Sequence, residues 1–233
     1  MERLDPCTEE ALIAHLLQFV TPEKRARMAG VIGKRTCFLR VVLEDVFQPH
    51  NASAVMRSCE CFGIQHLHVI ENRYAYTLNR EVAMGSSNWI HLHRHNRKDA
   101  DNTADCLREL RKEGYRIVAT SLDSSSIPIR DLKLDSPLAL WFGTEEEGLS
   151  ETVLREADAH VHIPMFGFTQ SFNISVSAAI CLHELRHRLE STGSDPGLTP
   201  AEIRAVYRLW LRKSLKNGEI LERTFLQSRQ QDV

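Results

Sequence analysis

Short apolar runs alternate with amphipathic stretches along most of the chain. The runs predict strands over 38–46, 66–70, 115–122, 137–143 and 160–165, with a half-buried strand over 89–95. Helices are predicted between them, over 51–62, 99–113, 150–157 and from 173 onward. Strands that alternate with helices form a mainly parallel sheet covered by helices on both faces. The pattern therefore predicts an α/β fold.

The two ends of the chain are predicted to be helical instead. Thr8 is expected to cap a first helix, and Thr21 followed by Pro22 to start a second. A linker-like segment, 191–197, precedes a helix that begins at Thr199. We therefore expect three parts: a helical N-terminal arm over 1–35, a main domain over 36–190, and a helical C-terminal extension over 191–233.

Composition adds little to this picture. The chain of 233 residues is 42% hydrophobic and 26% charged, with a net charge of −2, as in ordinary soluble domains. No apolar run has the length of a membrane span, and MERLDPCTEE lacks the order of a signal peptide, so a cytoplasmic location is expected. Six scattered cysteines without a C-x-x-C pair favour reduced thiols.

One segment of the N-terminal arm is strongly basic. Five bases accompany a single acid, Glu23, and they are Lys24, Arg25, Arg27, Lys34 and Arg35. Such a run is either a solvated helix face or a surface for RNA phosphates.

Three polar segments follow predicted strands, the position where α/β proteins bind ligands. They are NASAVMR at 51–57, FGTEEEGLS at 142–150 and IPMFGFTQSFNIS at 163–175. Simpler interpretations exist, because Asn51 and Asn173 are suited to cap helices and Arg57 to pair with Glu60. No G-x-G-x-x-G follows a strand, so a Rossmann-type site is not supported.

Together, and in this order, the three segments resemble the motifs of the SpoU/TrmH family of S-adenosyl-L-methionine (AdoMet)-dependent RNA ribose 2′-O-methyltransferases, in the SPOUT superfamily. The resemblance covers about residues 36–190, with Phe172 where the family usually has leucine. It implies a C-terminal trefoil knot from the 140s to the 180s and a homodimer. Because the N-terminal arm is short, it implies a tRNA (guanosine-2′-O-)-methyltransferase acting on guanosine 18 of the D-loop.

The resemblance also implies roles for individual residues. AdoMet is expected among Thr120, Gly143, Gly148, Ile163, Met165 and Phe172. Catalytic roles fall to Asn51, Arg57, Glu145, Ser171 and Asn173, and RNA contacts to Arg25, Arg27, Lys34 and Arg35. A guanidinium resists deprotonation, so Arg57 is interpreted as orienting the acceptor and stabilising charge rather than as a general base.

Three alternatives stay open: an rRNA methyltransferase of the same family, a non-catalytic RNA-binding module, and a zinc protease. The last rests on His183-Glu184-Leu185-Arg186-His187, an H-E-x-x-H with no third ligand after it. Leu182, Leu185 and Leu189 indicate instead that this helix packs a core with its histidines at the margin. The repeat His91-x-His93-x-His95 lacks acid or cysteine partners at a useful spacing, so no metal is expected.

Overall fold

The computed structural model describes residues 4–193 and 195–231, which form two compact units. One unit runs from Thr36 to Pro196. The other joins the segment before Thr36 to the segment from Gly197 onward. The two helical ends, predicted from the sequence as separate arms, therefore belong to one unit.

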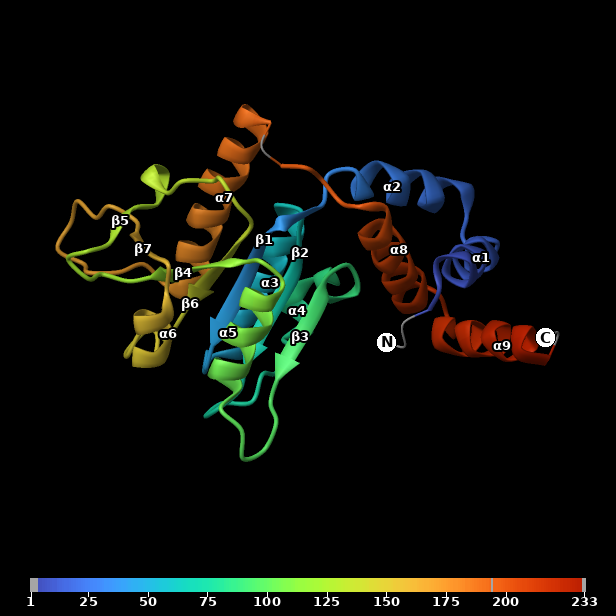
Figure 1. Cartoon of the computed structure of the whole chain (residues 1–233), viewed down its shortest axis with the longest axis horizontal. Helices are drawn as coiled ribbons and strands as arrows, with labels where there is room; N and C mark the ends of the chain where they lie inside the picture. Colours follow the sequence, from blue (N-terminus) through green and yellow to red (C-terminus); the bar gives the residue numbers. More distant parts are fainter. Residues whose placement is uncertain (1–3, 194, 232–233) are drawn as a thin grey trace. The chain divides into compact units, whose positions relative to one another are not determined.

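A seven-stranded sheet, parallel throughout, forms the centre of the larger unit, in the order β3-β2-β1-β6-β4-β7-β5 (Figure 1). Its strands are β1 (Thr36–Glu44), β2 (Ile64–Ile70), β3 (His91–His95), β4 (Arg116–Thr120), β5 (Ile127–Pro128), β6 (Leu138–Phe142) and β7 (Ala159–His162). The prediction of a parallel α/β sheet is confirmed. The two-residue β5 was not predicted, and β7 ends at His162, where Ile163-Pro164 begins an irregular loop.

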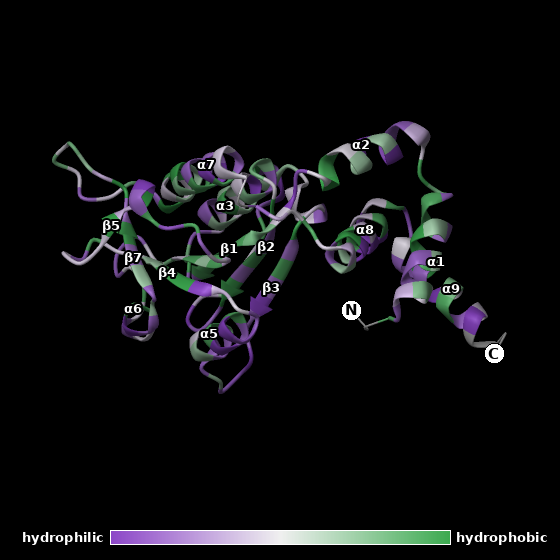
Figure 2. Ribbon diagram, turned by 45° about the horizontal axis from the view of Figure 1, so that its top comes forward, coloured by the Kyte–Doolittle hydropathy of each residue, from purple (hydrophilic) through white to green (hydrophobic). Residues whose placement is uncertain are grey.

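Helices cover both faces of this sheet. On one face α3 (Pro49–Cys61) packs against α7 (Ile174–Thr192), and on the other lie α5 (Asn102–Lys112) and α6 (Glu151–Glu156) (Figure 1). Each face has its own apolar core, and the apolar strands run between the two helical layers in Figure 2. The helix α4 (Arg80–Ala83) and two 3₁₀ turns, Ser86–Asn88 and Ile129–Asp131, complete the unit. The trefoil knot stays a prediction.

Several helix starts of the larger unit follow the expected capping chemistry, but the start of α3 does not. Ser150 caps α6 and Asn173 caps α7, each accepting a hydrogen bond from a backbone N–H of the first turn. Asn51 does not cap α3, because the helix begins at Pro49 and Gln48 is its N-cap residue. Proline is favoured at the first helical position, which places Asn51 inside the first turn. Its side chain is therefore available for other contacts.

The second unit contains α1 (Pro6–Leu17), α2 (Pro22–Ile32), α8 (Pro200–Ser214) and α9 (Gly218–Gln231), with α1 in contact with both α8 and α9. Asp5, rather than the expected Thr8, caps α1. Leu12 and Leu16 are fully buried. Arg208 and Glu222 form a buried ion pair between α8 and α9, with Nε donating to Oε1 at 2.9 Å. The polar α9 lies within the predicted helical extension over 191–233, although the sequence places no separate helix there.

None of the helices in the described part of the chain is both long enough and apolar enough to span a bilayer.

Candidate functional site

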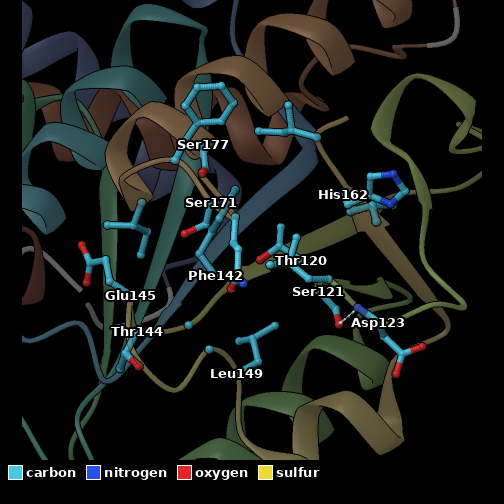
Figure 3. Close-up of a pocket in the computed structure, with 18 of the residues that line it drawn as sticks. Thr120, Ser121, Asp123, Phe142, Thr144, Glu145, Leu149, His162, Ser171 and Ser177 are labelled. Atoms are coloured by element: carbon cyan, nitrogen blue, oxygen red, sulfur yellow. Dashed lines mark hydrogen bonds between the residues drawn. The ribbon is translucent and has the colours of Figure 1, made fainter. Parts of the chain in front are cut away.

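A cavity of about 520 Å³ opens at the carboxyl ends of β4, β6 and β7. Figure 3 shows side chains converging on it from the strand ends, from the loop after β6, and from the segment that leads into α7. All six residues predicted to bind the cofactor line it, together with two predicted catalytic residues: Thr120, Gly143, Gly148, Ile163, Met165, Phe172, Glu145 and Ser171. Residues up to 52 positions apart in the sequence thus surround one space.

The loop after β6 is closed by its own backbone. Thr144 N–H donates to the Gly148 carbonyl at 3.0 Å, and Gly148 N–H donates to the Thr144 carbonyl at 3.1 Å. Gly148 has a φ of +72°, which favours glycine. A methyl group on Gly143 would overlap the carbonyl group of Gly148 and the amide nitrogen of Leu149. Glycine at 143 is therefore required for this loop to fold back onto the strand end.

A hydrogen-bond network joins the three sequence motifs. Asn51, only 3% exposed, donates from its amide nitrogen to Glu145 at 2.5 Å and to Gln48 at 3.0 Å. Its amide oxygen accepts from the Asn173 side chain at 3.1 Å. The Asn173 oxygen in turn accepts from the Ser175 backbone at 2.9 Å. Each amide thus both donates and accepts a hydrogen bond. These bonds fix the orientation of the Glu145 carboxylate at the cavity edge.

Arg57 is exposed on α3, nearly two helical turns after Asn51. It is not among the cavity-lining residues. The suggested ion pair with Glu60 is absent, and within residues 4–193 and 195–231 no hydrogen bond or ion pair is found for the Arg57 guanidinium. Its charge is therefore available to a ligand, and its catalytic role stays a prediction.

Three residues that line the cavity have features of their own. The Thr120 hydroxyl donates to the Trp141 carbonyl at 2.8 Å, so it ties β4 to β6. Phe172 is 41% exposed at the cavity margin. Asp123 also lines the cavity and was not predicted from the sequence. A hydrogen bond from the Ser125 backbone N–H lowers the pKa of the Asp123 carboxyl group. The signal for it was Asp-Ser-Ser-Ser at 123–126, a turn sequence just after a strand.

The basic segment divides into exposed and packed side chains. Arg27 and Lys34 are exposed, and the exposed Arg25 donates from Nε to the Val20 carbonyl at 2.9 Å. The expectation of an RNA contact by Arg35 is wrong, because this side chain is 2% exposed and its guanidinium lies 5.4 Å from the Trp210 ring centroid. Arginine stacks readily on aromatic faces, which explains its packing inside the helical unit.

The H-E-x-x-H segment lies in the middle of α7. Leu182, Leu185 and Leu189 are fully buried, whereas His183 and His187 are exposed. The predicted placement of the histidines at the margin of a core helix is confirmed.

Comparison with known proteins bears directly on this arrangement. A model of the SpoU rRNA Methylase family matches residues 38–183, well over half of the chain. The chain belongs to the SpoU rRNA methylase family. The match spans the whole network of Asn51, Glu145 and Asn173 as well as the cavity.

Relatives within the SpoU family are also similar over nearly the full length. A tRNA (guanosine(18)-2′-O)-methyltransferase of Borreliella burgdorferi is 43% identical, over 90% of this chain and 94% of its own. One from Thermus thermophilus is 35% identical over 83% of this chain and 98% of its own. The solved A. aeolicus TrmH/SpoU tRNA modifying enzyme superposes with a TM-score of 0.74 at 31% identity, covering 83% and 98% of the two chains.

A second similar solved structure carries a cofactor. It is the AdoMet-bound rRNA methyltransferase from Sinorhizobium meliloti, with a TM-score of 0.58 and 28% identity over 68% of this chain and 59% of its own.

Proposed function

We propose that this SpoU-family chain is an AdoMet-dependent tRNA (guanosine-2′-O-)-methyltransferase that methylates the ribose 2′-hydroxyl of guanosine 18. One observation carries the proposal: the single cavity that gathers all six expected cofactor residues lies beside the hydrogen-bonded Asn51, Glu145 and Asn173. The names of the Borreliella and Thermus relatives support the choice of nucleotide.

The residues present fit an adenosyl ligand. The backbone around Gly143 and Gly148 approaches the cavity without side chains in the way, and Ile163, Met165 and Phe172 supply apolar surface for an adenine ring. Asp123 offers a carboxylate acceptor for hydroxyl or ammonium groups. When bound, AdoMet supplies an electrophilic methyl group for in-line displacement by the ribose oxygen.

The chain's own residues then position the acceptor oxygen and stabilise the charge that develops on it. Correct alignment of the acceptor oxygen alone accounts for several kcal/mol of barrier. Asn51 holds Glu145 at the cavity edge, and Asn173 restrains Asn51 from the start of α7. Arg57, with no protein partner found among the described residues, orients the RNA and stabilises the negative charge that develops on the 2′-oxygen.

Nucleoside mass spectrometry tests this proposal. The full chain is incubated with AdoMet and unmodified tRNA or rRNA, and the digested nucleosides are analysed. We expect 2′-O-methylguanosine from tRNA, absent from a transcript with guanosine 18 replaced by adenosine. A methyl group on a base would overturn the chemistry, and product only from rRNA would favour the rRNA alternative. AdoMet binding without any product would favour the non-catalytic module.

The basic helix of the N-terminal segment is proposed to bind tRNA phosphates. Arg27→Ala is expected to weaken tRNA binding, because removing one true phosphate contact lowers the salt slope by about one. Affinity measured across a salt series checks this, with AdoMet affinity unchanged. Arg204→Ala is a matched control, since Glu9 and Glu10 already pair with that arginine. An unchanged slope for Arg27→Ala would make the basic run a solvated face.

A homodimer is also proposed, through the exposed aromatic loop that follows β7. Phe166 and Phe168 are 96% and 108% exposed, which is unusual for large apolar side chains.

Light scattering of the wild-type chain is expected to give twice the monomer mass of 26.6 kDa. Burial of one Phe contributes about 1.5–3 kcal/mol, so Phe168→Asp is expected to weaken dimerisation at least ~10-fold. Phe47→Asp, an equally apolar exposed site elsewhere, is the control. A monomeric wild-type chain contradicts the proposal.

A further inference from the structure

Five histidines form a layer on one face of the sheet edge. His66 and His68 of β2 lie beside His91, His93 and His95 of β3, because the strands pair in the register His66↔His91 and His68↔His93. The rings stack, with centroids 4.3 Å apart for His68 and His93 and 5.0 Å for His66 and His91. The face they occupy is the one covered by α5. Imidazoles here replace the apolar side chains found on neighbouring strands.

No metal is expected from the sequence, because the β3 histidines lack acid or cysteine partners at a useful spacing along the chain. The fold supplies them from other elements. Nδ1 of His68 lies 3.1 Å from Nε2 of His95 and 3.9 Å from Sγ of Cys106 on α5. All three potential ligand atoms lie within 4.8 Å of one another. A second group meeting the same distance limit contains His68, His93 and Glu109.

These distances suit a tetrahedral metal ion. With metal–nitrogen bonds of about 2.0 Å and metal–sulfur bonds of about 2.3 Å, two nitrogens lie about 3.3 Å apart and a nitrogen and a sulfur about 3.6 Å apart. The observed 3.1 and 3.9 Å differ from these by a few tenths of an ångström. The third pair, Nε2 of His95 and Sγ of Cys106, lies within 4.8 Å, and side-chain rotations would bring all three atoms to ligand distances.

We propose that His68, His95 and Cys106 bind a divalent transition-metal ion of the zinc type, with Glu109, on the same helix as Cys106, as the carboxylate for the fourth position. Nitrogen and thiolate ligands select such ions over magnesium or calcium. Glu109 lies three residues after Cys106 and so on the same side of α5. A surface cavity lined by His93, His95 and Glu109 gives the ion a route from solvent.

Imidazole nitrogens bind a metal ion in their neutral form, and the Cys106 thiol releases its proton when it binds.

Two further features of the surroundings matter. Nε2 of the fully buried His68, the ring nitrogen other than the proposed ligand atom Nδ1, has no hydrogen-bond partner among the described residues. Arg40 opposes a cation from the neighbouring strand, but Glu113 pairs with its guanidinium at 2.6 Å. The thiolate and Glu109 supply the negative charge that the ion needs.

Cobalt(II) titration tests the site directly. The full chain, free of any histidine tag and stripped with a chelator, is titrated with Co²⁺ alone. We expect one equivalent to bind with tetrahedral ligand-field bands and a thiolate-to-cobalt charge-transfer band, all displaced by Zn²⁺. Cys106→Ser is expected to abolish the charge-transfer band. His95→Ala is expected to weaken binding about 100-fold or more, beyond the 10–100-fold typical of losing an outer-shell partner.

Matched controls come from the same chain. Cys61→Ser removes an exposed cysteine and His183→Ala an exposed histidine of the H-E-x-x-H segment, and both are expected to bind Co²⁺ as the wild type does. Circular dichroism establishes that each variant is folded. If Cys106→Ser does not fold, the Co²⁺ affinity of His95→Ala, on the edge strand β3, tests the proposal instead. No stoichiometric Co²⁺ in the wild type, or unchanged spectra in His95→Ala, overturns the proposal.

Discussion

Replacing Arg57 with alanine is expected to reduce single-turnover methyl transfer to tRNA about 100-fold or more. Arg57 is exposed and its guanidinium has no protein partner among the described residues, so its loss breaks no ion pair or side-chain hydrogen bond there. The cavity does not include Arg57. AdoMet affinity, measured by calorimetry, and the free energy of unfolding are therefore expected to stay close to the wild-type values.

Two variants make this result specific. Arg57→Lys keeps the charge but loses the planar fork, so we expect only partial recovery of the rate. Arg155→Ala removes another exposed arginine, on α6, and is expected to leave transfer unchanged. Near wild-type transfer by folded Arg57→Ala protein that binds AdoMet would exclude Arg57 from catalysis.

The second large effect is expected from Gly143→Ala. The added methyl group overlaps the backbone of Gly148 and Leu149, which cannot rotate away as a side chain would. Overpacking of this kind costs about 1–3 kcal/mol. If the loop shifts to relieve it, AdoMet binding weakens by a similar free energy, about 10–100-fold. Calorimetry measures the loss of AdoMet affinity, and urea unfolding measures the loss of folding stability. Together they show how the free-energy cost divides between the two.

Gly30→Ala is the control for this substitution. Gly30 lies within α2 and an added methyl group there meets no atom within 4 Å. Alanine is the better helix former, so this variant is expected to be more stable by ~0.5–1 kcal/mol. Wild-type stability and AdoMet affinity in Gly143→Ala would mean that the loop after β6 is not held as described.

The sequence predicted the sheet and the cavity well because both depend on local patterns. Apolar runs gave the buried parallel strands, and the polar segments at 142–150 and 163–175 were placed correctly at their ends.

The residues that cap the helices were less predictable. Asn51 was expected to cap α3, but Pro49 starts the helix two residues earlier and leaves Asn51 to bind Glu145.

What the sequence did not reveal depends on pairings between distant elements. Arg35 belongs to a basic run, yet Trp210, far along the chain, determines that it is packed rather than exposed. The partners of His95 were invisible because His68 and Cys106 reach it only through the β2–β3 register and the packing of α5. Periodicity describes one element at a time and does not contain this information.

The helical unit has a consequence for the order in which the chain folds during synthesis. Leu12 and Leu16 of α1 are buried in a unit whose other half, α8 and α9, is translated only after the whole of Thr36–Pro196. At about 5–20 residues per second, that interval lasts on the order of ten seconds or more. Until α8 and α9 are synthesised, the apolar faces of α1 and α2 are therefore not covered by these helices. The core of the helical unit forms only when the last helices have left the ribosome.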